Sequence, residues 1–529
     1  MTASHQQLSK FAAVFAGGTM ISRVLGLVRD ITITALVPGV SRDAFIVAFR
    51  FPNMLRDLVG EGASNAAFVP VLSETIEKES EAAFRELVSA LLSAMVVILG
   101  VITILGVLFV PLLLHLLGAL EHVTGTDNLT EHDVALMMSL ARWTFPYIFL
   151  IGLAVFAMGP LFIMKHYATP SWSPALLNVA LILTCVAFRD RFPDPAYALV
   201  CGVWLGGLAQ LAVQYVALRK HAGVWLPNFH LRHPGIRQAL WLLAPVLLGQ
   251  AAGEVNKLVD NLFAASLANG SVTALFYANR LIQLPLAVFG IAIAAAILPT
   301  ISRAAARTDL AEVRGTLMHG LRQCLFLISP ALVGLVVLHR PIVALLFQRG
   351  AFGVDDATRT SAALLFYAGG LLFFAWVKVA VAGFYAVQDT KTPVIAASLS
   401  MGLNIALNFA LVRPLGYRGL ALATTISFAV NFLLLYALLC RRFGALWDRA
   451  FVSGLLRIAL AALAAAVVAY LGLSFAQRLH PTDALAGRAI RVFIPLAGAG
   501  VSYALVCAAL RVKELGLFIG ILRRSGGGS

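Results

Sequence analysis

The segment ISRVLGLVRD (21–30) decides which class of protein this sequence encodes. It lies within an apolar run, about residues 11–37, that is long enough to cross a lipid bilayer. Near the middle of that run, however, stand Arg23, Arg29 and Asp30. A charged side chain at the centre of a membrane helix costs ~2.5–3.5 kcal/mol on insertion scales. Three such charges therefore predict a polar environment inside the membrane.

The composition of the whole chain also points to a membrane. Of its 529 residues, 60% are hydrophobic and 12% are charged, and the mean hydropathy is +0.88. A soluble protein of this length could not bury so much apolar surface. The net charge of +15 is spread over short loops rather than gathered in a basic domain, which argues against a nucleic-acid partner. The five cysteines stand singly in apolar segments and are predicted to be packing residues.

We predict an all-α polytopic membrane protein with 14 transmembrane helices, in two pseudo-symmetric six-helix lobes followed by two C-terminal helices. Lys and Arg are more frequent in the loops that face the cytoplasm if the N-terminus is inside, so both termini are predicted to be cytoplasmic. The helices are expected near residues 11–37, 43–75, 86–118, 133–164, 171–188, 196–219, 237–268, 272–303, 313–348, 357–388, 392–412, 417–440, 451–476 and 489–511.

An internal repeat supports the two lobes. A shift of 230 residues places Asp30 on Asp260 and Arg50 on Arg280, and later LNVAL (177–181) matches LNIAL (403–407). Two halves repeated in the same orientation are a transporter design with the substrate site between the halves. The expected domains are an N-lobe (1–225), a C-lobe (226–445), a C-terminal helix pair (446–512) and a tail (513–529) that ends in the linker-like SGGGS.

Polar and charged side chains share one face on several predicted helices. An internal ion-pair network needs acids to match its arginines, whereas a hydrated cavity that receives an anion accommodates a surplus of them. A guanidinium can bind phosphate through two parallel hydrogen bonds, so the surplus predicts a phosphorylated substrate. Helical ion pairs that only hold the protein together are the alternative, notably for Lys257 and Asp260. Five arginines face three acids on the first, second and eighth helices: Arg23, Arg29, Arg50, Arg56 and Arg280 against Asp30, Asp57 and Glu61.

Other classes of function lack their sequence signals. The chain has no Walker-type nucleotide motif and no His/Cys cluster, which indicates secondary transport and not an enzyme. An enzyme acting on polyprenyl phosphates would need paired carboxylates for Mg²⁺. A channel would need a continuous pore of like residues, and a drug exporter would be expected to have an acidic, aromatic cavity.

Four segments resemble the MurJ (MviN) lipid II flippases of the multidrug/oligosaccharidyl-lipid/polysaccharide exporter superfamily. They are SRVLGLVRD (22–30), DAFIVAFRFPNMLRDLVGEGASNAAFVPVLSE (43–74), FYANRLIQLP (276–285) and VKVAVAGFYAVQDTKTPV (377–394). The resemblance implies a protein of the bacterial inner membrane that moves lipid II, the undecaprenyl-diphosphate-linked peptidoglycan precursor, to the periplasmic leaflet. It implies alternating access driven by an ion gradient or the membrane potential, and other cell-wall synthesis proteins as further partners. The alternative is a flippase for another polyprenyl-linked saccharide such as O-antigen.

The same resemblance implies two sets of site residues. A polyprenyl-tail groove is implied beside 451–476 and 489–511, and Asn279 and Gln283 depart from a family pattern that often has acids there. No cofactor is expected beyond Na⁺, whose site is implied at Asp260, Asn404, Asn408, Leu420 and Thr424. The implied substrate-binding residues are Arg23, Arg29, Asp30, Asp43, Asn53, Arg56, Glu61 and Arg280.

Overall fold

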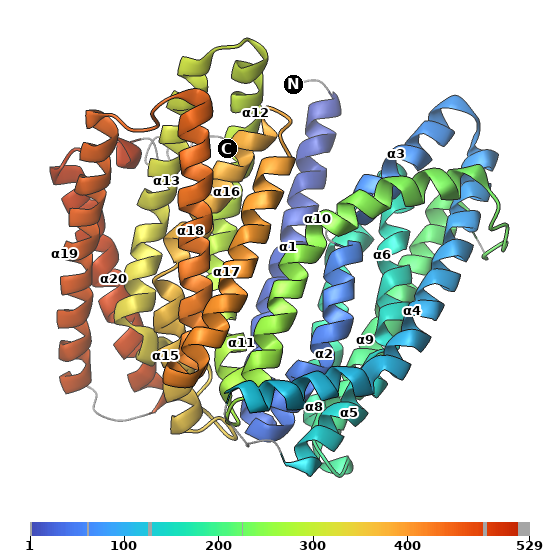
Figure 1. The fold of residues 1–529 in the computed structure, drawn as a ribbon, viewed down its shortest axis with the longest axis horizontal. Helices are drawn as coiled ribbons and strands as arrows, with labels where there is room; N and C mark the ends of the chain where they lie inside the picture. Colours follow the sequence, from blue (N-terminus) through green and yellow to red (C-terminus); the bar gives the residue numbers. More distant parts are fainter. Residues whose placement is uncertain (1–2, 61–62, 125–129, 225, 480–483, 517–529) are drawn as a thin grey trace. The chain divides into compact units, whose positions relative to one another are not determined.

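A computed structural model describes residues 3–60, 63–124, 130–224, 226–479 and 484–516, and these residues form helices joined by short turns, with no strand (Figure 1). The chain divides into two compact units. The first comprises residues 1–272 with 349–352, and the second comprises 273–348 with 353–529. An all-helical fold follows from the environment, because in lipid every backbone polar group must find its partner within the chain.

Helices of the first unit pack as neighbours along the sequence and across it. A short 3₁₀ turn (Arg189–Arg191) follows α8. The helices are α1 (Ala3–Leu36), α2 (Gly39–Gly60), α3 (Ala63–Lys78), α4 (Glu81–Thr124), α5 (Glu131–Thr144), α6 (Tyr147–Ile163), α7 (Ala168–Trp172), α8 (Pro174–Phe188), α9 (Ala196–Ala222) and α10 (Pro234–Ala265).

The second unit begins within α11. A stretch of π-helix (Leu286–Ile291) separates α11 from α12. The helices are α11 (Ser271–Pro285), α12 (Ala292–Ala306), α13 (Leu310–Val337), α14 (His339–Leu346), α15 (Val354–Ala368), α16 (Leu371–Tyr385), α17 (Lys391–Leu415), α18 (Tyr417–Phe443), α19 (Arg449–Leu479) and α20 (Leu485–Ala509).

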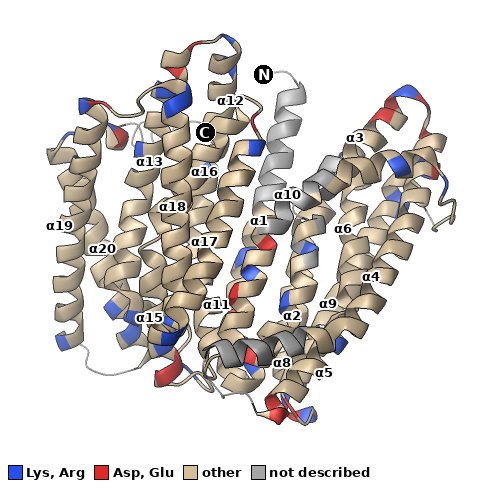
Figure 2. Ribbon diagram, in the orientation of Figure 1, with Lys and Arg blue, Asp and Glu red and all other residues tan. Residues whose placement is uncertain are grey.

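Ten helical segments among the described residues are long and apolar enough to cross a membrane. The pair α15 and α16, bent by 42° at the break between them, makes an eleventh when counted as one span. The other three predicted spans fall on α1, on α2 with α3, and on α10. Most charged residues lie towards helix ends, whereas α1 and α2 carry charges partway along their length (Figure 2). The total of 14 remains a prediction.

Five predicted spans are not the continuous α-helices that were expected. A proline lacks the backbone N–H that would continue the helix, and its ring clashes with the preceding turn. A glycine pair has no Cβ atoms to restrict the backbone at a bend. The interruptions lie before Pro146, before Pro174, after Pro285, three residues before Pro341 and at Gly369–Gly370.

The internal repeat recurs as local structure. Lys165 and Gln388, 223 residues apart, are both non-glycine residues with positive φ, at 57° and 60°. Each follows the last turn of an equivalent helix, α6 in one case and α16 in the other. Since few non-glycine residues adopt this conformation, its recurrence at the repeat distance marks the same turn in both halves.

The residue after each of these turns binds a threonine at the start of the next helix. His166 Nε2 lies 2.7 Å from Thr169 Oγ1, and the Asp389 carboxylate accepts from the amide and hydroxyl of Thr392. Asp389 also accepts from Arg442 at 2.7 Å. The Thr392 amide, with help from the Thr392 hydroxyl and Arg442, holds the pKa of Asp389 below its usual value. One connection therefore uses two chemistries, a histidine in the first half and a carboxylate in the second.

Helix α10 departs from the expected lobe boundary. The repeat assigns it to the second half, but it packs against α2, α3 and α4 within the first unit. The lobe boundaries at residues 225 and 445, and the extent of the C-terminal pair, remain predictions.

Helices α19 and α20 are packed closely together and against α13. Small residues at four-residue spacing on α19 (Ala461, Ala465 and Ala469) are buried there, which lets neighbouring backbones approach closely. The Tyr503 hydroxyl donates to the Phe326 carbonyl at 2.8 Å and so ties α20 to α13.

The end of α1 is fastened by a buried arginine, Arg42, that the sequence did not reveal. Its guanidinium donates to the carbonyls of Thr34 and Val37, the last acceptors of α1, and lies 4.9 Å from the Phe352 ring. Arginine often binds the free carbonyls at a helix C-terminus. The charge of Arg42 is thus used for structure.

The segment 349–352 that supplies Phe352 makes a close approach to α1. Ala351 donates its amide to the Ala35 carbonyl at 2.8 Å. Gly350 has φ +55°, and a Cβ atom there would lie 2.1 Å from the Ala35 carbonyl oxygen.

Gly350→Ala is therefore expected to destabilise the protein by more than the ~1–2 kcal/mol of a left-handed alanine, because a steric clash is added. The measurement is the melting temperature of the purified protein. Gly353→Ala is the matched control, since its φ is −78° and a Cβ atom there meets open space. Equal melting temperatures for the two variants would contradict this account of the segment.

Candidate functional site

Arg29, in the middle of α1, is held by two partners. Its Nε and Nη2 donate to Asp30 Oδ1 at 3.0 and 2.6 Å, and its Nη1 donates to Asn178 Oδ1 at 2.9 Å. Asp30 is 1% exposed, whereas the Arg29 side chain is 12% exposed. The guanidinium is fixed in orientation, and these bonds use three of its five N–H donors.

Asn178 is a site residue that sequence reasoning missed. Its Oδ1 accepts from Arg29 while its Nδ2 donates to the Ser22 carbonyl at 3.0 Å, so α8 orients the α1 arginine from both sides of one amide. A signal was available, because Asn178 is the repeat equivalent of Asn404, a predicted sodium ligand.

A second charged cluster joins α2 to α10. Arg50 Nη2 lies 3.2 Å from Glu254 Oε2, and Lys257 Nζ lies 2.5 Å from Glu254 Oε1. The Arg50 and Glu254 side chains are 14% and 10% exposed. One buried carboxylate therefore binds two cations.

This cluster corrects the expected surplus of arginines. The sequence count compared arginines and acids on the first, second and eighth helices only, so it omitted Glu254 on the seventh. In the described part of the chain, both Arg29 and Arg50 have a carboxylate partner. The ion-pair interpretation thus holds for Arg50, and the cationic character rests on the remaining arginines.

Asp43, predicted to bind substrate, is buried in a structural contact. Its Oδ2 accepts from the Gly270 amide at 2.6 Å, which ties α2 to the turn after α10. Gly270 has φ +90°, so this turn uses a conformation that favours glycine. A role for Asp43 in substrate binding remains a prediction.

The other predicted substrate residues differ in exposure. Arg23 is exposed on α1, and Asn53 and Arg56 are half-buried on α2. Glu61 lies outside the described residues. Arg280 is exposed on α11 and belongs to the second unit.

The predicted sodium ligands of α17 and α18 form a buried polar row within the second unit. Asn408 Nδ2 donates to Asn404 Oδ1 at 3.2 Å, and Asn404 Nδ2 donates to Thr424 Oγ1 at 3.5 Å. Thr424 Oγ1 in turn donates to the Leu420 carbonyl at 3.0 Å. Both asparagines are fully buried, and Asp260, on α10 in the first unit, is half-buried.

Comparisons with known proteins agree over most of the chain. The family model described as lipid II flippase MurJ matches residues 34–487. A relative from Vibrio cholerae, named "Probable lipid II flippase MurJ", is 37% identical over 82% of each chain. The "Lipid II flippase MurJ" of Burkholderia cenocepacia is 34% identical over 81% of this chain and 83% of its own.

The chain belongs to the MurJ lipid II flippase family. As a MurJ-family protein with many apolar helices, it is a multi-pass protein of the bacterial inner membrane.

Solved structures agree with the MurJ assignment. A lipid II flippase MurJ in an inward closed conformation matches with a TM-score of 0.77 and 26% identity, over 94% of this chain and 99% of its own. An inward-facing MATE-family multidrug transporter matches with a TM-score of 0.64 and 18% identity, over 82% of this chain and 98% of its own. The second match extends the shared fold to the wider superfamily.

The Arg50–Glu254–Lys257 cluster of this MurJ-family chain can be tested by mutation. Glu254→Gln removes the acceptor of two cations and should cost up to ~3–5 kcal/mol, the range for a broken buried pair. Arg50→Gln should cost less, because Glu254 keeps Lys257. In the double variant the losses should be less than additive, by ~0.5–3 kcal/mol. Melting temperatures of the purified proteins measure all three.

The exposed pair Lys78–Glu74, 2.7 Å apart, provides the control cycle. Its variants Lys78→Gln and Glu74→Gln should change stability by less than ~1 kcal/mol each. Additive losses at Arg50 and Glu254 would show that the two residues are not coupled.

Proposed function

We propose that the protein is a flippase that moves lipid II from the cytoplasmic to the periplasmic leaflet by alternating access. The match of the family model over residues 34–487 carries this proposal, supported by relatives whose names state this activity. Both termini are placed in the cytoplasm, following the distribution of Lys and Arg between loops. Other cell-wall synthesis proteins are proposed as partners.

Arg29 is the residue best prepared to bind the diphosphate of such a substrate. Its two partners fix the plane of the guanidinium, and two N–H donors remain beyond the three bonds that the described structure shows. A planar, preorganised fork binds a phosphate through two hydrogen bonds with little further loss of entropy. Because Asp30 offsets the charge of Arg29, further positive charge is needed, and we assign it to Arg23, Arg56 and Arg280.

Secondary transport by an ion gradient or by the membrane potential is proposed as the driving force. A cation near the centre of the bilayer couples to the potential, since moving one charge across it is worth ~2.3 kcal/mol per 100 mV. Exposed membrane arginines such as Arg23 are suited to such coupling.

Growth of a bacterium depleted of its own lipid II flippase tests this function. The gene should restore growth, and Arg29→Ala, Arg56→Ala and Arg280→Ala should each abolish rescue at normal abundance. Lysine at these positions should restore function only in part, because it lacks the planar fork. Arg191→Ala, at an exposed loop arginine, is the control and should rescue fully.

Two results would contradict the proposal. Failure of the well-expressed wild type would move the substrate to another lipid-linked saccharide such as O-antigen. Rescue by all three alanine variants would remove the diphosphate role of the arginines.

A Na⁺ site at Asp260, Asn404, Asn408, Leu420 and Thr424 is proposed on the basis of the repeat. In the first half, the Arg29 cation joins Asp30 to Asn178. The repeat equivalents of the acid and the amide are Asp260 and Asn404, and the equivalent of Arg29 is Val259. A hard cation that prefers carboxylate, amide, hydroxyl and carbonyl oxygens supplies the charge that the valine cannot.

The prediction is that the purified protein melts at a higher temperature in NaCl than in KCl or choline chloride. Asp260→Asn and Asn404→Ala should abolish the difference, whereas Asp190→Asn, on an exposed loop, should keep it. Identical melting of the wild type in the three salts would exclude the sodium site.

A further inference from the structure

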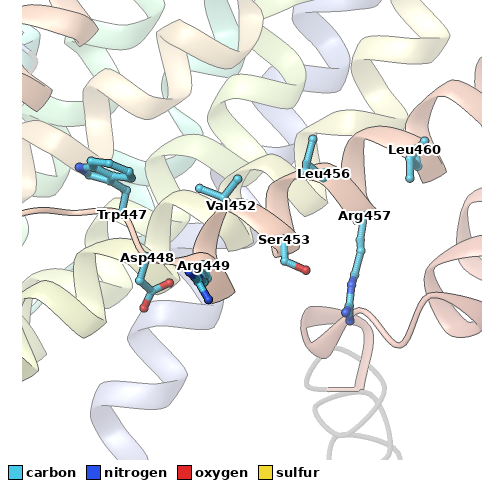
Figure 3. Close-up of a pocket in the computed structure, with 8 residues that line it drawn as sticks. All are labelled: Trp447, Asp448, Arg449, Val452, Ser453, Leu456, Arg457 and Leu460. Carbon is cyan, nitrogen blue, oxygen red and sulfur yellow. The ribbon is translucent and has the colours of Figure 1, made fainter.

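A groove runs along the first three turns of α19, away from the charged clusters described above. Arg449, Ser453 and Arg457 follow one another at four-residue spacing and therefore share one face of the helix. The groove has a volume of about 560 Å³. Figure 3 shows the residues that line it: Trp447, Asp448, Arg449, Val452, Ser453, Leu456, Arg457 and Leu460.

The polar side chains of the groove suit an anion. Both arginines are exposed, and a serine hydroxyl lies between them in the row. Arg457 donates to the Leu510 carbonyl at 3.1 Å, which uses one of its five N–H donors. Asp448 accepts from the Phe451 amide at 2.5 Å and so caps the helix. The lining keeps a net positive charge, to which the N-terminal end of α19 adds.

The apolar side chains of the groove suit a hydrocarbon chain. Val452, Leu456 and Leu460 are exposed beside the polar row, and the apolar face continues through Leu463 and Val467. These residues belong to a helix of 31 residues that is apolar enough to span a membrane. Acyl chains of the bilayer are therefore the natural cover of this face.

Trp447 places the groove at the edge of the membrane. Its ring is 64% exposed and stands just before the first residue of α19. Tryptophan is enriched at the level of the lipid headgroups, and basic side chains beside it contact the phosphates of anionic lipids.

From these neighbours we propose that the groove at the start of α19 binds an anionic glycerophospholipid. The phosphodiester lies between Arg449 and Arg457 and accepts from Ser453, while one acyl chain follows Val452, Leu456 and Leu460. A soluble phosphate would use the arginines alone, so the apolar row distinguishes a lipid from a free anion. This site is independent of the proposed transport of lipid II.

The test titrates the purified full-length protein in detergent with phosphatidylglycerol carrying brominated acyl chains, and records the quenching of tryptophan fluorescence. The chain has seven tryptophans, so the difference between wild type and Trp447→Phe isolates the signal of the groove. Saturable quenching that depends on Trp447 is expected. Brominated phosphatidylethanolamine, which has no net charge, should quench it at least tenfold more weakly.

Three variants separate the two halves of the site. R449Q/R457Q should weaken phosphatidylglycerol binding about tenfold or more, since two cations are lost at the headgroup. R418Q/R478Q removes the same charge from exposed arginines at the other ends of α18 and α19 and should bind as the wild type does. Leu456→Ser should weaken binding without a change of charge.

Several results would overturn the proposal. These are equal affinity for the two lipids, unchanged binding in R449Q/R457Q, or an equal loss in R418Q/R478Q. Displacement of the lipid by millimolar inorganic phosphate would show that the groove takes a free anion instead.

Discussion

A guanidinium inside a membrane keeps its charge, and the structure of the first unit depends on how that charge is met. Arg42 binds the last carbonyls of α1, Arg50 binds Glu254, and Arg29 binds Asp30 and Asn178. Each solution joins different helices, so the charges that make these segments poor membrane spans also hold them together. A buried charge without a partner would cost several kcal/mol, which limits how far these helices can change independently.

Arg29 differs from the other two because its binding capacity is not used up. Arg42 is completely buried, and the carboxylate that meets Arg50 is shared with Lys257. Arg29 is held in a fixed plane but remains partly exposed. A fixed and accessible fork is what phosphate recognition requires, whereas a buried one serves the fold. This distinction separates the candidate site from the structural charges around it.

Much of the fold could be predicted because its signals are local or periodic. Apolar segments gave the spans, and the offset between LNVAL and LNIAL anticipated the turns at Lys165 and Gln388, which have the same conformation. The breaks at Pro146 and Gly369 were present in the sequence but were masked by the hydrophobicity around them. Pairings between distant residues could not be predicted, since Arg50 and Glu254 are 204 positions apart and Arg29 and Asn178 are 149 apart. Counting charges on three helices therefore overstated the surplus of arginines.

The central claim is that Arg29, oriented by Asn178, recognises the diphosphate of lipid II. The most direct measurement is the movement of fluorescent lipid II across liposomes that contain the purified protein, compared between wild type and Asn178→Ala. The variant keeps every charge and loses only the orientation of the guanidinium. The account predicts that the wild type moves lipid II well above protein-free liposomes and that Asn178→Ala moves it at least tenfold more slowly, at equal reconstitution and stability. Equal rates for the two proteins would contradict it.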